Sequence, residues 1–278
     1  SGERLDALKG CVQIAVQGTD TSGGPLRLGD AKGLAAWLCG LEGGCALLTS
    51  GPAAGKTWLV SQVVMHTLGE RVPILVKVEQ LQTRLADIEA ADDWVDAYLA
   101  LTLDAGHVAL LREAMTTGRA LLLLDGLDEA GAHRARIERH VAEVVARRGC
   151  VLLCTSRPAG LSEGIFDGFH KLELVQLSDA QQRGFLERRL GSARASELAP
   201  YLENRVPVDA DTRRRVTANP LMLSMVASIA KLREGIKMPE TTAELYGVAV
   251  SAMLQRAGVT VSDTAVALLQ ATFFEAHA

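Results

Sequence analysis

Aromatic residues are scarce in this 278-residue chain, at 4% of the total. So few rings argue against a surface on which single-stranded nucleic acids or sugars stack. Neither sign of charge dominates, because 29 Lys and Arg stand against 33 Asp and Glu, for a net charge of −4. This balance argues against a protein that coats nucleic acid, and we expect no direct nucleic-acid partner.

Long apolar runs are also missing. No purely aliphatic block is longer than the one at residues 120–124, whereas a membrane-spanning helix needs about 20 apolar residues. The first residues show no basic segment followed by an apolar one, as a secretory leader would. We therefore expect a cytoplasmic protein without a membrane partner.

The cysteines offer no framework of disulfides or zinc ligands. There are five, an odd number, and none forms a CxxC pair. Three of them, Cys45, Cys150 and Cys154, lie in or beside apolar segments. We expect buried, reduced thiols, which are typical of a cytosolic protein.

The apolar residues that are present, 48% of the chain, are enough for a sizeable core. Aliphatic runs predict strands at 45–49, 72–78, 120–124, 150–155 and 171–174. Amphipathic spacing predicts helices at 31–41, from 56 to about 66, and at 92–103, 107–115 and 133–148. Residues 18–25 have the composition of a loop. Strands that alternate with helices predict an α/β fold, with a parallel sheet covered by helices on both faces.

Beyond residue 177 the pattern becomes helical only. Ser178 with Gln181 forms a capping box, Asn219-Pro220 is a cap with proline at the first helical position, and Thr241 with Glu244 is a second box. We therefore predict a leader over 1–40, an α/β core over 41–176 and a helical domain over 177–236. The last residues, 265–278, still read as helix, so we expect the chain to be a piece of a longer protein.

A small-residue loop between the first core strand and its helix is typical of a phosphate-binding P-loop. Its residues are Ser50, Gly51, Pro52, Ala53, Ala54, Gly55, Lys56 and Thr57. Backbone N–H groups and the helix N-terminus would hold the phosphates, Lys56 would reach the β- and γ-phosphates, and Thr57 would bind Mg²⁺. Trp58 follows, packed either beside the nucleotide or in the core. The pattern normally begins with glycine, and Ser50 at that position is acceptable if its φ stays negative.

Acidic residues follow the strand at 120–124. Asp125 directly follows four leucines, and Asp128 and Glu129 come within the next turn. Ligands of open parallel sheets lie at the carboxyl ends of strands, so Asp125 would hold Mg²⁺ opposite Thr57. Either Asp128 or Glu129 would orient or deprotonate an attacking water.

The next strand ends in Thr155, Ser156 and Arg157. We expect this strand to lie beside the acidic strand or the P-loop strand, so that its end also faces the ligand. Thr155 or Ser156 would then hydrogen-bond the γ-phosphate or the water, and Arg157 would respond to phosphate occupancy.

Together, the P-loop, the Asp125-to-Glu129 run and the Thr155-Ser156-Arg157 end resemble NACHT-type NTPases, a family of signal-transduction ATPases. The segment 219–223 resembles the family's Asn-Pro-Leu segment, which implies that Pro220 packs against adenine. Residues 237–278 resemble the start of its winged-helix region.

The resemblance implies ATP or ADP with Mg²⁺ as ligands and slow hydrolysis. It also implies homo-oligomerisation on activation, with sensor and effector domains outside this segment. An alternative is a structural ATP/ADP-binding module that hardly turns over. A small-molecule kinase is disfavoured, because no arginine-rich lid is present.

Overall fold

The computed structural model describes residues 13–209, 212–232, 238–245 and 247–248. They form two compact units, which divide between Gln176 and Leu177. No helix in these ranges is both long and apolar enough to cross a lipid bilayer. The predicted winged-helix region and Cys11 lie largely or wholly outside the described residues.

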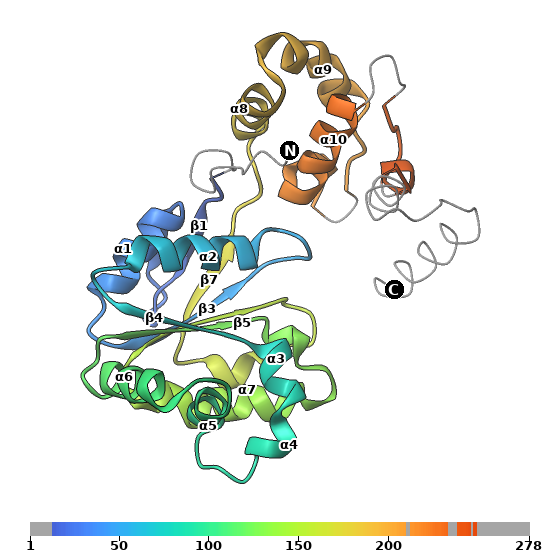
Figure 1. Ribbon diagram of the computed structural model, residues 1–278. Helices are drawn as coiled ribbons and strands as arrows, with labels where there is room; N and C mark the ends of the chain where they lie inside the picture. Colours follow the sequence, from blue (N-terminus) through green and yellow to red (C-terminus); the bar gives the residue numbers. More distant parts are fainter. Residues whose placement is uncertain (1–12, 210–211, 233–237, 246, 249–278) are drawn as a thin grey trace. The chain divides into compact units, whose positions relative to one another are not determined.

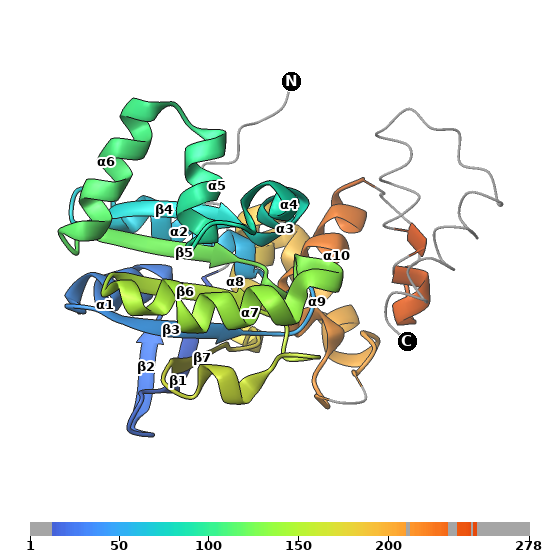
Figure 2. The same cartoon turned by 90° about the horizontal axis from the view of Figure 1, so that it is seen from below.

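The first unit is built on a seven-stranded sheet in the order β2-β1-β7-β3-β6-β5-β4 (Figures 1 and 2). The strands are β1 (Val16–Thr19), β2 (Pro25–Gly29), β3 (Gly44–Thr49), β4 (Val72–Lys77), β5 (Ala120–Asp125), β6 (Val151–Ser156) and β7 (His170–Leu174). Strands β3 to β7 run parallel to one another, whereas β1 pairs antiparallel with both β2 and β7. The α/β fold with a mostly parallel sheet is thus confirmed.

Helices cover both faces of this sheet (Figure 1). One face carries α1 (Ala31–Gly40) and α2 (Lys56–Thr67). The other carries α3 (Val78–Thr83), α4 (Leu85–Ile88), α5 (Trp94–Thr102), α6 (Ala105–Thr116), α7 (Arg134–Glu143) and the short helices η1 (Leu127–His133), η2 (Val145–Arg148) and η3 (Glu163–Phe166). Alternate residues of β5 serve the two cores: Leu121 and Leu123 face α1 and α2, whereas Leu122 and Leu124 face the other layer. Burial on both faces explains why the central strands are continuously aliphatic.

Several elements were not predicted. The structure has a β1–β2 hairpin where the sequence reads as a loop, so residues 13–40 contribute two strands and α1 to the sheet unit. Helices α3, α4 and η1 were also missed, and the helix predicted at 133–148 divides into α7 and η2.

The second unit contains α8 (Asp179–Leu190), α9 (Ser192–Asn204), η4 (Val216–Ala218) and α10 (Pro220–Leu232). The capping box at Ser178 and Gln181 is confirmed, with both of its hydrogen bonds present. At the start of α10 the Asn219 Oδ1 accepts the N–H of Leu221 at 2.9 Å, so the predicted cap is formed. Thr241 Oγ1 likewise accepts the N–H of Glu244 at 3.1 Å.

The thiols of Cys45, Cys150 and Cys154 are free and buried, as predicted. Burial raises the pKa of Cys45 to about 11 and raises the pKa values of Cys150 and Cys154 as well.

Since the thiolate is the reactive form, we expect these three thiols to resist a disulfide reagent at pH 7.5 until the protein unfolds. Thiol titration of a Cys11→Ser variant, before and after denaturant, tests this. Fast reaction of more than the half-buried Cys39 in the native protein would contradict it.

Candidate nucleotide site

The loop between β3 and α2 curls through two left-handed residues. Gly55, the residue before α2, has φ of 99°, and Ala53 has φ of 55°. The left-handed conformation costs alanine about 1–2 kcal/mol of steric strain. Such strain is often found at functional sites. Ser50 does not have a positive φ, so serine is accommodated there without backbone strain. The strained position of the loop is therefore Ala53.

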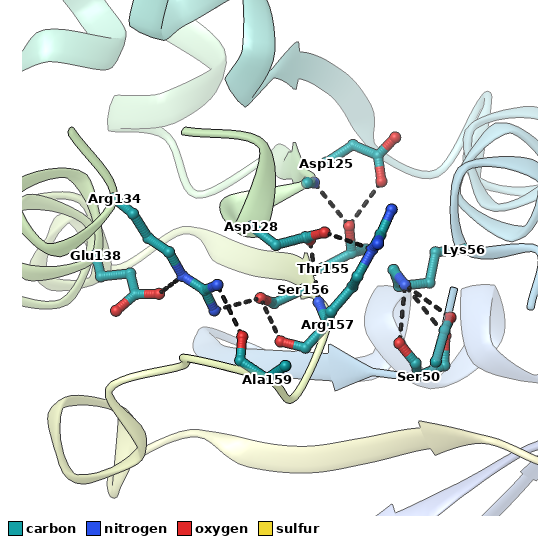
Figure 3. Close-up of polar contacts among 12 residues, drawn as sticks. Ser50, Lys56, Asp125, Asp128, Arg134, Glu138, Thr155, Ser156, Arg157 and Ala159 are labelled. Carbon is teal, nitrogen blue, oxygen red and sulfur yellow. Dashed lines mark hydrogen bonds and ion pairs between the residues drawn. The ribbon is translucent and has the colours of Figure 1, made fainter. Parts of the chain in front are cut away.

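Lys56, the first residue of α2, folds back over this loop (Figure 3). Its Nζ donates to the carbonyl oxygens of Ser50 at 2.9 Å and Gly51 at 3.3 Å. Burial lowers the pKa of Lys56, and the nearby carboxylates, Asp128 first, partly offset this effect. The ammonium thus lies between the loop and the acidic segment that follows β5.

Asp125 ends β5 with its side chain buried, and Thr155 of β6 is its partner. The Thr155 hydroxyl donates to Asp125 Oδ1 at 2.6 Å and accepts the Gly126 N–H at 2.9 Å. Since β6 lies between β3 and β5, it borders both predicted strands, and its end is next to the loop that follows β3 and to Asp125. This placement confirms the expected neighbourhood of the three strand ends.

Asp128 holds Arg157 by two contacts (Figure 3). Its Oδ1 accepts the Arg157 backbone N–H at 3.0 Å, and its Oδ2 pairs with the Arg157 Nε at 2.9 Å. The Asp128 side chain is only 9% exposed, whereas that of Arg157 is 43% exposed. The guanidinium is thus anchored at one nitrogen and still accessible to a ligand.

Glu129 differs from its neighbour Asp128. Its carboxylate makes no hydrogen bond or ion pair with the residues that the structure describes. Desolvation raises the pKa of Glu129, and the negative charges of Asp128 and then Asp125 raise it further. The two acidic residues that the sequence could not separate therefore have different surroundings.

Other predicted residues lie around this centre or elsewhere. Thr57 is exposed at the first turn of α2, and Trp58 is half-buried. The Thr155 hydroxyl donates to Asp125, the Ser156 hydroxyl donates to the Arg157 carbonyl, and their contact with a phosphate or water stays a prediction. Pro220 begins α10 of the helical unit, and its contact with a base stays a prediction.

Two residues near the site were missed from the sequence. Arg134 and Glu138 of α7 form a buried ion pair against the segment after β6 (Figure 3). Their spacing of four residues on a predicted helix indicates an ion pair. Such pairs are common on helices that lie far from any functional site, so the spacing alone does not point to a site.

The donor set suits a hard cation. Oxygen ligands at Asp125 and the exposed Thr57 hydroxyl are those that Mg²⁺ prefers. Among the described residues, no group of three His, Cys, Asp or Glu side chains lies close enough to hold a metal. Mg²⁺ that is bound by one or two side chains together with phosphate oxygens does not need such a group.

No family model and no curated protein matches the chain. Among solved structures, a Signal Transduction ATPase with Numerous Domains (STAND) protein with a tetratricopeptide repeat sensor, from Pyrococcus horikoshii, is similar at 15% identity and a TM-score of 0.42. That similarity covers 76% of this chain and 30% of the other, so the chain spans only part of that protein.

Two further solved structures show similarity at the same level. The Aeropyrum pernix ORC1 protein, in complex with DNA, has 15% identity and a TM-score of 0.43, over 80% of this chain and 63% of its own. C. elegans PCH-2 has 14% identity and a TM-score of 0.39, over 82% and 67%. The function is therefore inferred from the residues of the site.

Proposed function

We propose that the sheet unit binds ATP or ADP with Mg²⁺ and hydrolyses ATP slowly, as the switch domain of a NACHT-type signalling protein. One observation carries the proposal: Lys56, Asp128 and Arg157 meet where three neighbouring strands end, beside a curled loop of small residues. A polyphosphate would accept hydrogen bonds from the loop N–H groups and the α2 N-terminus. Its negative charge would offset the two cations.

Each residue has a distinct part in this proposal. Lys56 would leave the carbonyl oxygens of Ser50 and Gly51 to bind the β- and γ-phosphates. Arg157, held by Asp128, would contact the γ-phosphate, so that the site would distinguish ATP from ADP. Glu129 would accept the proton of the attacking water, since its carboxylate is not engaged by other described residues and desolvation raises its pKa.

Mg²⁺ bound at Thr57 and Asp125 would neutralise charge that develops on the phosphate oxygens. The buried Asp125 carboxylate is already oriented for this by the Thr155 hydroxyl, at 2.6 Å. Replacing that hydroxyl would remove the orientation without removing the ligand, as is typical of residues behind a metal ligand.

The wider role is proposed on the resemblance alone. A sensor and an effector domain outside this segment, and assembly into a homo-oligomer on activation, would link the nucleotide state to signalling in the cytoplasm. The resemblance also implies that Pro220 of the helical unit would contact adenine.

The second candidate is a structural ATP/ADP-binding module with negligible turnover. Ser50 in the first position of the loop, where its carbonyl and hydroxyl oxygens both lie within reach of the Lys56 ammonium, is the feature that favours it. In this case the nucleotide would stabilise the fold without being converted.

Single-turnover hydrolysis separates the two functions. We expect the purified protein to convert bound ATP to ADP, and Asp128→Asn to do so at least about tenfold more slowly, because Arg157 loses a charge-assisted hydrogen bond. The measurement is the release of labelled phosphate from excess enzyme. Equal residual rates in the two proteins would favour the structural module.

A further inference from the structure

A buried ion pair on α7, which the proposed function does not use, borders the segment that carries Arg157. Glu138 is completely buried, and the Arg134 side chain is 19% exposed. Arg134 Nε donates to Glu138 Oε1 at 2.7 Å. Burying two charges costs several kcal/mol, so such a pair contributes little net stability compared with apolar residues of the same size.

Most of the remaining hydrogen bonds of this pair go to residues 156–162. Arg134 Nη1 donates to the Ala159 carbonyl at 2.8 Å, and Nη2 reaches Ser156 Oγ at 3.4 Å. Glu138 Oε2 accepts the N–H of Ser162 at 3.2 Å. The pair therefore fixes both ends and the middle of this segment to α7. Figure 3 shows the contacts of Arg134 with Ser156 and Ala159.

Gly160 in the same segment lies close to the Arg134 guanidinium. Its φ of +70° is in the left-handed region, and a Cβ there would lie 3.2 Å from Arg134 Nη1. Only glycine leaves both the turn and the guanidinium undisturbed. The segment is thus shaped around Arg134.

The segment begins beside Arg157. Ser156, whose Oγ accepts from Arg134, donates to the Arg157 carbonyl at 2.9 Å, and Arg157 is then held by Asp128. The stretch that carries Asp128 and Glu129 runs through η1 directly into α7. Arg134 and Glu138 therefore connect the stretch that carries Asp128 and Glu129 to residues 156–162, which carry Arg157.

We infer that Arg134 and Glu138 are positioning residues that hold Arg157 in place for the γ-phosphate, and so set the preference of the site for ATP over ADP. This inference rests on the proposed function. Neither residue touches the ligand in this account, and both act through Arg157.

An apolar replacement of the whole pair separates positioning from folding. Arg134→Met combined with Glu138→Leu leaves no buried unpaired charge, so we expect thermal unfolding close to that of the wild type. The ratio of the Kd for ADP to that for ATPγS, measured by calorimetry with Mg²⁺, should fall about fivefold or more. The matched control is Arg136→Met with Glu89→Leu, which removes an exposed ion pair between α7 and the residue that follows α4, and should leave the ratio unchanged.

Coupling to Arg157 is the decisive measurement. In an Arg157→Ala background, we expect the double replacement to cause no further fall in the ratio, because the group that it positions is already absent. An additive fall would show that the pair does not act through Arg157, and would overturn the inference. An unchanged ratio in the wild-type background would also overturn it.

Hydrogen exchange tests the same pair without any nucleotide. The amides of Arg157 and Ser162 should exchange faster in the double replacement than in the control. Unchanged exchange would overturn the inference while leaving the proposed function intact. If the wild type bound neither nucleotide, the proposed function would fail, together with the role in discrimination, whereas exchange would still report whether the pair holds the segment.

Discussion

Lys56→Ala is expected to weaken the binding of both ADP and ATP by about 100-fold or more, the largest effect on affinity from any single change in this site. Lys56 brings the ammonium that lies between the P-loop and the acidic segment, and each hydrogen bond from a charged donor contributes about 1.5–3 kcal/mol. Two such bonds to phosphate correspond to at least about 3 kcal/mol, or a factor of 100 or more. Calorimetric titration with each nucleotide and Mg²⁺ measures the loss.

The control for this prediction is Lys32→Ala, which removes an exposed lysine of α1 and should leave both affinities unchanged. Stability should change little in Lys56→Ala, because burial already disfavours the charged form in the fold, as its lowered pKa shows. Thermal unfolding without nucleotide checks this point. An affinity within threefold of the wild type, in a folded Lys56→Ala protein, would contradict the P-loop assignment.

The elements that the sequence predicted share a local signal. Strands β3, β5 and β6 are runs of apolar residues buried on both faces, and such runs are visible without knowing their neighbours. Strand β1 has no such signal, since it is a four-residue strand that contains Gly18 and alternates in burial. Its place depends on pairing with β7, more than 150 residues away, as in the Gln17–Glu173 hydrogen bond. Only the folded chain brings those residues together.

The sequence predicts which side chains lie at this edge of the sheet better than it predicts their contacts. Asp125 ends β5, and Asp128 and Arg157 follow β5 and β6, so topology alone brings them to one edge of the sheet. The division between Asp128, which binds Arg157, and Glu129, which does not, depends on side-chain directions within a single turn. Likewise, the sequence directed attention to strain at Ser50, whereas the strained residue is Ala53.

Glu129→Gln is expected to slow ATP hydrolysis by about 100-fold or more while leaving ADP and ATP affinity within about threefold. General-base catalysis contributes about 10²–10⁴-fold, and glutamine keeps the shape of the side chain but cannot accept the proton. Single-turnover hydrolysis gives the rate, and calorimetry gives the affinities. Glu143→Gln, at an exposed position of α7, is the matched control and should keep the wild-type rate. Equal loss of affinity and rate would show that Glu129 binds nucleotide rather than activating water.

The pH dependence of hydrolysis gives the same residue a second, independent signature. A base must be deprotonated, so the rate falls as pH falls through the pKa of Glu129. Since desolvation and the charges of Asp128 and Asp125 raise that pKa, the decline should begin at a higher pH than for an ordinary glutamate. Asp128→Asn removes the charge with the larger effect on the pKa of Glu129. The residual activity of this variant should therefore decline at a lower pH than the activity of the wild type. A decline at the same pH in both proteins would mean that another group is the base, because the Asp128 charge contributes to the raised pKa of Glu129.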